Sequence, residues 1–142
     1  MFLAYNPIVQ LETWTADELW ADTEANSITF EACEDCDICC MHMLDKDMEK
    51  GAKDTFTMSE NFKKCLKDPR KKNYFMSTTN SNGWKAKEIK IHYSDQTSVE
   101  CTLNGFLKAR SGGEQRLPLS CNPGMKYIFE HSILSNMLST LI

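Results

Sequence analysis

Apolar and polar residues alternate along most of the chain between residues 8 and 121, and turn-forming residues interrupt the alternation at roughly 8–15-residue intervals. A period of two is typical of a strand that buries one face, and many short strands of this kind indicate an antiparallel β-sandwich. We therefore predict a mainly β fold with seven to eight strands. They are expected near residues 8–11, 27–31, 38–44, 55–58, 73–77, 84–93, 98–110 and 117–119. The strand near 8–11 and the strand near 117–119, which contains Pro118, are expected at sheet edges. The strongly apolar strand at 38–44 is expected at the centre of a sheet, covered on both faces.

The strand that begins at Trp84 is the best-defined element. Its apolar residues are even-numbered at first and odd-numbered later, at Ile89 and Ile91. A β-bulge near residues 87–88 is the simplest way to keep both halves on one core. We expect Trp84, Ile89 and Ile91 to meet Phe56 between two facing sheets.

Two further patterns predict helices outside the sandwich. Thr15 and Glu18 have the spacing of a capping box, which predicts a short helix over residues 16–25. Residues 131–142 carry apolar side chains at helical spacing and predict a C-terminal amphipathic helix. This helix would dock on its own sandwich or contact a membrane or another subunit. The expected division is an N-terminal extension (1–25), a sandwich (26–121) and a tail (122–142) in one domain.

Seven cysteines in 142 residues favour an oxidising compartment with up to three disulfides. One thiol would remain for burial or for an intermolecular bond. A zinc site at the repeated Cys-x-x-Cys spacing is an alternative, although a second half with ligand spacing is missing. The candidates are Cys33, Cys36, Cys39, Cys40, Cys65, Cys101 and Cys121.

Charge is unevenly distributed although the net charge is only -4, a balance that argues against a dedicated nucleic-acid binder. Residues 31–54 hold eight acids and three lysines, so one end or face is expected to be acidic and another basic. The sequence contains no run of about 18 apolar residues, so we expect no transmembrane segment. The basic candidates for contact with anionic headgroups or an acidic protein are Lys63, Lys64, Lys67, Arg70, Lys71 and Lys72.

Motifs for catalysis are not found. The chain lacks a nucleophile elbow, a Walker loop, a His-Glu-x-x-His sequence and the Rossmann glycine pattern. His42, His92 and His131 have no catalytic motif around them. We therefore expect a binding module rather than an enzyme.

The segment from Asp47 to Phe56 resembles the acidic-aromatic-acidic-basic-Gly-x-x-Asp-x-Phe signature of PLAT/LH2 domains, the β-sandwiches of lipoxygenase N-termini and plant stress proteins, with Met48 at the aromatic position. An acidic turn at residues 34–37 and the Gly-Trp at 83–84 agree with the order of elements in that family. Cys65, after the Asp-x-Phe element, resembles the cysteine-bearing secreted variety. The resemblance covers about residues 26–121.

This resemblance implies attachment to a lipid surface or a protein partner through the loops, in some members with calcium. Calcium needs several oxygen ligands that converge from loops. A secreted binding module is therefore the predicted function, and the alternatives are a secreted toxin or effector acting on a host protein and a structural subunit of an extracellular assembly. A homo-oligomer through the tail or an unpaired cysteine also remains open. The acids best placed for a cation are Asp35, Asp37, Asp45 and Asp47.

Overall fold

The computed structural model describes residues 6–34, 39–65, 73–110 and 112–122, and this part of the chain holds eight strands and one short helix. The first four strands are β1 (Ile8–Thr15), β2 (Ile28–Cys33), β3 (Cys39–Met43) and β4 (Lys53–Thr57). The helix α1 spans Glu60–Cys65. The remaining strands are β5 (Asn73–Thr78), β6 (Ala86–Tyr93), β7 (Ser98–Leu103) and β8 (Gln115–Cys121).

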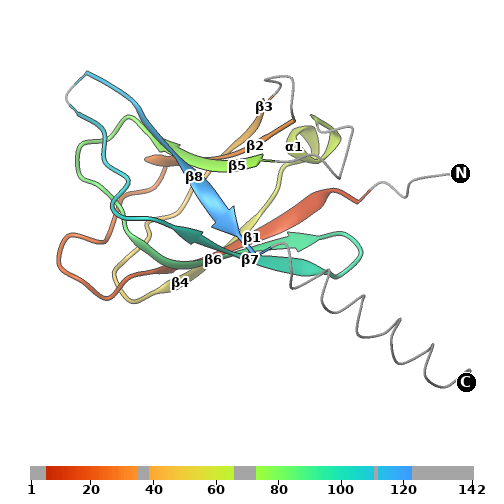
Figure 1. Ribbon diagram of the computed structural model, residues 1–142, viewed down its shortest axis with the longest axis horizontal. Coiled ribbons are helices and arrows are strands. Elements are labelled where there is room, and N and C mark those ends of the chain that lie inside the picture. The colour runs from red at the N-terminus through yellow and green to blue at the C-terminus, as the bar shows by residue number, and fades with distance from the viewer. Residues whose placement is uncertain (1–5, 35–38, 66–72, 111, 123–142) are drawn as a thin grey trace, which may run out of the picture.

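All strand pairs are antiparallel, and the order is β3-β2-β5-β8-β7-β6-β1-β4. The sheet curls over so that β3, β2 and β5 face β4, β1, β6 and β7, which gives the two layers of the predicted sandwich (Figure 1). Strand β8 joins the layers, because residues 115–118 pair with β5 and residues 119–121 pair with β7. The strand was expected at an edge because proline lacks an amide hydrogen. Pro118 instead stands where β8 changes neighbours, a place where a missing donor is tolerated.

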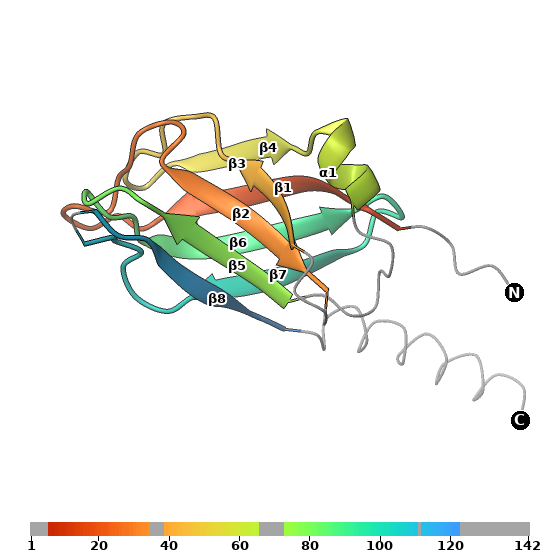
Figure 2. The same cartoon turned by 90° about the horizontal axis from the view of Figure 1, so that it is seen from above.

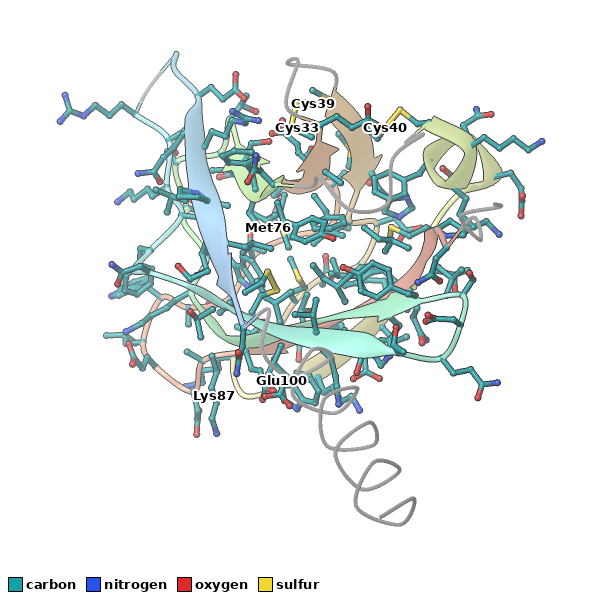
Figure 3. All side chains as sticks on the ribbon, turned by 45° about the vertical axis from the view of Figure 1, so that its right-hand side comes forward. Cys33, Cys39, Cys40, Met76, Lys87 and Glu100 are labelled. Atoms are coloured by element: carbon teal, nitrogen blue, oxygen red, sulfur yellow. A yellow bond between two sulfur atoms is a disulfide. The ribbon has the colours of Figure 1, made fainter. Side chains whose placement is uncertain are left out.

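The core lies between the layers and contains the predicted residues. Phe56, Trp84, Ile89 and Ile91 are each no more than 1% exposed and belong to one hydrophobic cluster. Met76 of β5 points into this space from the opposite layer (Figure 3). The prediction that these side chains meet between the two layers is confirmed.

Two hydrogen bonds between side chains connect the elements around the core. The Trp84 indole Nε1 donates a hydrogen bond to Oγ1 of buried Thr15 at 3.0 Å. The hydroxyls of Tyr74 and Tyr93 are 2.5 Å apart and join β5 to β6 across the layers. Burial raises the pKa of both phenols, so both stay neutral.

The predicted bulge is present in β6. Trp14 pairs with Glu88 and Thr15 pairs with Ala86, so Lys87 is the extra residue. Trp84 and Ala86 are buried before the bulge and Ile89 is buried after it. The bulge therefore allows both halves of the strand to face one core.

Three expectations about the other elements differ from the structure. Residues 16–25 form bends, a turn and a bridge between Thr23 and Met48, so the predicted N-terminal helix is not confirmed. Strand β3 was expected to be central, but it lies at an edge and exposes Met41 and Met43. Strand β1 was expected at an edge and lies between β6 and β4. The predicted C-terminal helix lies outside the described residues.

Three disulfides link neighbouring elements. Cys33–Cys39 joins residues that face each other on β2 and β3, Cys40–Cys65 joins β3 to α1, and Cys101–Cys121 joins β7 to β8. Disulfides are typical of an oxidising compartment. Cys36 lies outside the described residues.

Candidate functional site

Four loops gather at one end of the sandwich. They cover residues 16–27, 44–52, 79–85 and 104–110, and they lie on the left in both ribbon views, whereas α1 lies at the opposite end (Figure 2). Antiparallel pairing produces this arrangement, because each of these loops leaves or enters a strand at the same end of its layer.

Apolar side chains project from this end. Leu19 and Trp20 are each 71% exposed, and Phe106 is 40% exposed. Lys85 connects the loop of residues 16–27 with that of residues 104–110. Its Nζ lies 2.8 Å from a carboxylate oxygen of Glu18 and 5.5 Å from the centre of the Phe106 ring. We call Leu19, Trp20 and Phe106 the apolar tip.

The backbone holds the tip outward. Trp20 has a φ of 67°, a left-handed conformation that is unusual for a bulky residue. The next residue, Ala21, is fully buried, and its carbonyl accepts a hydrogen bond from the amide of Lys85 at 3.2 Å. The chain therefore enters the core directly after Trp20, and the indole is left at the surface.

A pocket of about 360 Å³ opens beside Trp20. The Thr23–Met48 bridge joins two of the three loops that line it, and Asp47 Oδ1 accepts a hydrogen bond from the amide of Ala25 at 2.8 Å. Oxygen-bearing side chains dominate the wall. The lining residues are Trp20, Asp22, Thr23, Glu24, Asp47, Glu49 and Asn82.

The donor set of this acidic pocket fits a hard cation. Four carboxylates, one amide and the Thr23 hydroxyl surround it, and Thr23 Oγ1 is buried without a hydrogen-bond partner. Calcium takes six to eight oxygen ligands at about 2.3–2.6 Å. No three of these carboxylates have ligand atoms that all lie within 4.8 Å of one another. In the described chain, the one group of three potential ligands this close is Glu31, Cys33 and Cys39. The exposed carboxylates of the pocket would therefore have to turn inward around an ion.

Two of the four predicted calcium ligands, Asp45 and Asp47, belong to the part of the chain that the structure describes. Asp47 lines the acidic pocket. Asp45 instead acts on His42: burial lowers the pKa of that imidazole, and the negative charge of Asp45 partly opposes this shift. Asp35 and Asp37 lie outside the described residues. Sequence reasoning missed Asp22 and Glu24 because it assigned them to a helix; it also missed Glu49, which belongs to the same charged loop as Asp47.

The predicted basic cluster begins at the other end of the molecule. Lys63 and Lys64 belong to α1, where Lys63 Nζ lies 2.6 Å from the carboxylate of Glu60 and Lys64 is exposed. Lys67, Arg70, Lys71 and Lys72 lie outside the described residues. In the described chain, the acidic pocket and these two lysines are at opposite ends of the molecule.

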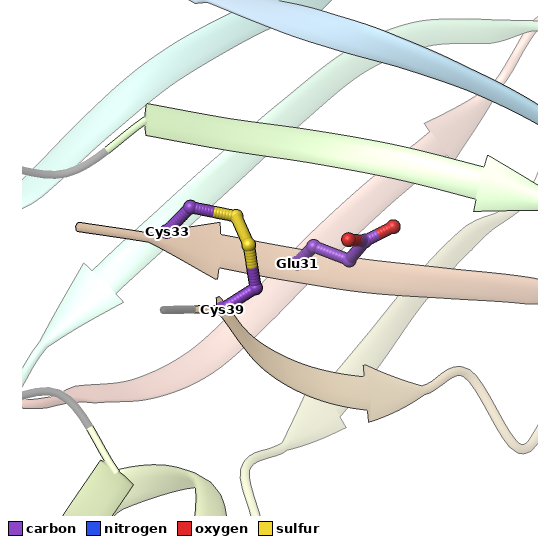
Figure 4. A group of neighbouring side chains, drawn as sticks. All are labelled: Glu31, Cys33 and Cys39. Atoms are coloured by element: carbon purple, nitrogen blue, oxygen red, sulfur yellow. A yellow bond between two sulfur atoms is a disulfide. The ribbon is translucent and has the colours of Figure 1, made fainter. Parts of the chain in front are cut away.

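The zinc alternative is not supported by the sulfur atoms as they stand. Glu31, Cys33 and Cys39 lie together on the outer face of β2 and β3, but the two sulfurs are bonded to each other (Figure 4). A disulfide sulfur lacks the negative charge of a thiolate ligand.

Comparison with known proteins shows which fold this is. No protein-family model and no curated protein matches the chain. Among solved structures, an alpha toxin from Clostridium absonum aligns over 80% of this chain and 31% of its own, with a TM-score of 0.64 and 21% identity. A lipoxygenase variant aligns over 82% of this chain and 17% of its own, with a TM-score of 0.61 and 17% identity. The fold is PLAT-like.

A Clostridium perfringens alpha-toxin gives a similar result, with a TM-score of 0.60, 16% identity and coverage of 80% of this chain and 32% of the toxin. The chain thus spans between about a sixth and a third of these larger proteins. The shared property is the PLAT-like fold, as the sequence resemblance predicted. None of the described helices has both the length and the apolar content to cross a membrane.

Proposed function

We propose that this PLAT-like domain is a secreted, non-catalytic module that attaches to a lipid surface through the apolar tip. The exposure of Leu19, Trp20 and Phe106 at one loop-bearing end is the observation that carries the proposal. The three disulfides support an oxidising, extracellular setting.

The composition of the tip suits a lipid interface better than bulk water. Tryptophan combines a large apolar ring with one N–H donor, and it is enriched where hydrocarbon meets headgroups. The neighbouring Leu19 adds aliphatic area, and Lys85, whose Nζ lies 5.5 Å from the centre of the Phe106 ring, places a positive charge beside the tip. Exposed apolar groups at one end of a soluble domain are a common mark of an interaction site.

The acidic pocket implies a role for calcium in this attachment. Asp22, Glu24, Asp47 and Glu49 place negative charge directly beside Trp20. This charge opposes an approach to anionic headgroups, and a bound divalent cation would neutralise part of it. We therefore infer that calcium increases binding, with the pocket acids and Thr23 Oγ1 as ligands.

A protein partner is the second candidate, as for a secreted effector. Edge strand β3 exposes Met41 at 64% and Met43 at 52%, and methionine is enriched at protein interfaces. The two clostridial toxins among the structural neighbours are compatible with this alternative. The outer face of β3, not the apolar tip, would then carry the contact.

Vesicle sedimentation tests the choice. The full chain is mixed with phosphatidylcholine vesicles, with or without phosphatidylserine, in calcium or in chelator. We expect the protein to pellet with vesicles, and to pellet more in calcium when phosphatidylserine is present. Recovery of all protein in the supernatant under every condition would refute lipid attachment, and binding that is equal in calcium and chelator would refute the role of the acidic pocket.

A further inference from the structure

Three potential metal ligands meet on the outer face of β2 and β3, far from the apolar tip. Glu31 and Cys33 are two residues apart on β2 and point to the same side, and Cys39 faces Cys33 across the strand pair. One ligand atom from each residue lies within 4.8 Å of the others. The strand ladder, which does not depend on the disulfide, sets this spacing.

Arg116 of β8 reaches over the group. Its Nε donates to Glu31 Oε1 at 3.2 Å, and its Nη2 lies 3.0 Å from Cys33 Sγ and 3.6 Å from Cys39 Sγ. The guanidinium group packs over the ring of Phe75, with Cζ 3.6 Å from the ring centre, and this cation–π contact fixes its position. A cation at this distance favours ionised sulfur, and a disulfide whose reduced form is stabilised is easier to reduce.

The length of the closed loop also distinguishes this disulfide. Cys33 and Cys39 are 6 residues apart, whereas the other two pairs are separated by 20 and 25 residues. A disulfide that closes a shorter loop removes less entropy from the unfolded chain. Opening Cys33–Cys39 should therefore lower the free energy of unfolding less than opening either of the other two. This disulfide can therefore open while the sandwich remains intact.

We propose that reduction of the Cys33–Cys39 disulfide creates a binding site for a thiophilic divalent cation, zinc being the best fit, with Glu31, Cys33 and Cys39 as ligands. A dithiol reductant supplies two electrons and two protons. The S–S bond breaks, two thiols form, and the reductant becomes a disulfide. Zinc binding then releases the two thiol protons to solvent.

The charges of the opened site balance those of such an ion. Two thiolates and the Glu31 carboxylate carry three negative charges, and Arg116 carries one positive charge 3.2 Å from that carboxylate. The remainder of two negative charges matches a divalent cation. Two sulfurs at about 2.3 Å and one oxygen at about 2.0–2.2 Å occupy three positions of a tetrahedron, and the fourth is left for water.

The first experiment asks which disulfide opens. A Cys36→Ser chain, which removes the seventh cysteine as a competing thiol, is treated with increasing dithiothreitol, alkylated and mapped by mass spectrometry. We expect Cys33 and Cys39 to be labelled before the other four cysteines. In an Arg116→Gln chain, more dithiothreitol should be required. Earlier labelling of Cys40 and Cys65, or of Cys101 and Cys121, would overturn the proposal.

The second experiment uses cobalt(II) as a spectroscopic substitute for zinc. The mildly reduced chain is expected to bind one cobalt with a thiolate-to-cobalt absorption band that zinc removes, and the oxidised chain should show no band. Glu31→Gln should weaken binding by roughly tenfold or more, since loss of a residue that only supports a ligand already costs about tenfold and Glu31 is itself a ligand. The control is a Cys33→Ser/Cys39→Ser chain in the same background, which keeps the other two disulfides and should give no band.

Two results would contradict the metal site. One is a thiolate band of equal strength in the Cys33→Ser/Cys39→Ser control, which would place the metal elsewhere. The other is the absence of any band in a reduced chain that is still folded, as judged by the emission of buried Trp84.

Discussion

Replacement of Trp20 by alanine should weaken attachment to vesicles about tenfold. The side chain offers roughly 200 Å² of surface, and it is 71% exposed. About 140 Å² is thus available for transfer, which at about 25 cal/mol per Å² corresponds to about 3.5 kcal/mol for complete burial. An indole that enters the interface to about two-fifths of this extent contributes about 1.4 kcal/mol, or roughly a factor of ten in the dissociation constant.

A vesicle titration followed by sedimentation measures this factor. Met41→Ala is the matched control, because it truncates an apolar side chain that is 64% exposed on β3, away from the loop end. We expect Met41→Ala to bind like the unaltered chain. The reasoning is refuted if Trp20→Ala binds vesicles as well as the unaltered chain, or if Met41→Ala weakens binding to the same extent.

Three further predictions concern the fold that supports the tip. Loss of the Cys40–Cys65 disulfide through a double change to alanine should lower the free energy of unfolding by about 3.5 kcal/mol, as expected for a closed loop of this length, and a guanidinium titration that shows no loss would contradict it. Thr15→Val should cost about 1–3 kcal/mol because it leaves the buried Trp84 indole N–H without an acceptor, whereas Thr15→Ser should retain most of the stability in the same titration. Burial lowers the pKa of His42 below its usual 6.5, so below about pH 6.5 the unfolded chain takes up the proton more readily and stability should fall as the pH falls. The urea midpoint should decrease less between pH 7.5 and pH 5.5 in His42→Gln than in the unaltered chain. Equal decreases would exclude His42 as a source of the pH dependence.

Strands could be predicted from the sequence because their signal is local. The change from even to odd apolar positions after Trp84 predicted a bulge near residues 87–88, since a register error would expose a whole face, and the structure has it at Lys87. The predicted helix over residues 16–25 shows where local signals fail. Its capping residues are engaged elsewhere, Thr15 by the Trp84 indole and Glu18 by Lys85.

The candidate site was less predictable because it is assembled from separate loops. Asp47 was identified as an acid in a charged loop, but its neighbours Asp22 and Glu24 come from the loop after β1. The Thr23–Met48 bridge that brings them together is a tertiary contact with no local sequence signal. The same limit applies to Arg116, which reaches Glu31 and Cys33 only because β8 and β2 flank β5.

Quenching of tryptophan emission by brominated lipids tests the central claim most directly. Trp84 is buried in the core and Trp14 lies on β1 beneath the Lys53 ammonium, which is 4.8 Å from its ring, so Trp20 is the tryptophan placed to enter lipid. We predict that vesicles containing brominated phosphatidylcholine quench the emission of the bound chain, and that most of this quenching is lost in Trp20→Phe. Bound protein whose emission is not quenched, or is quenched equally in Trp20→Phe, would show that another surface meets the membrane.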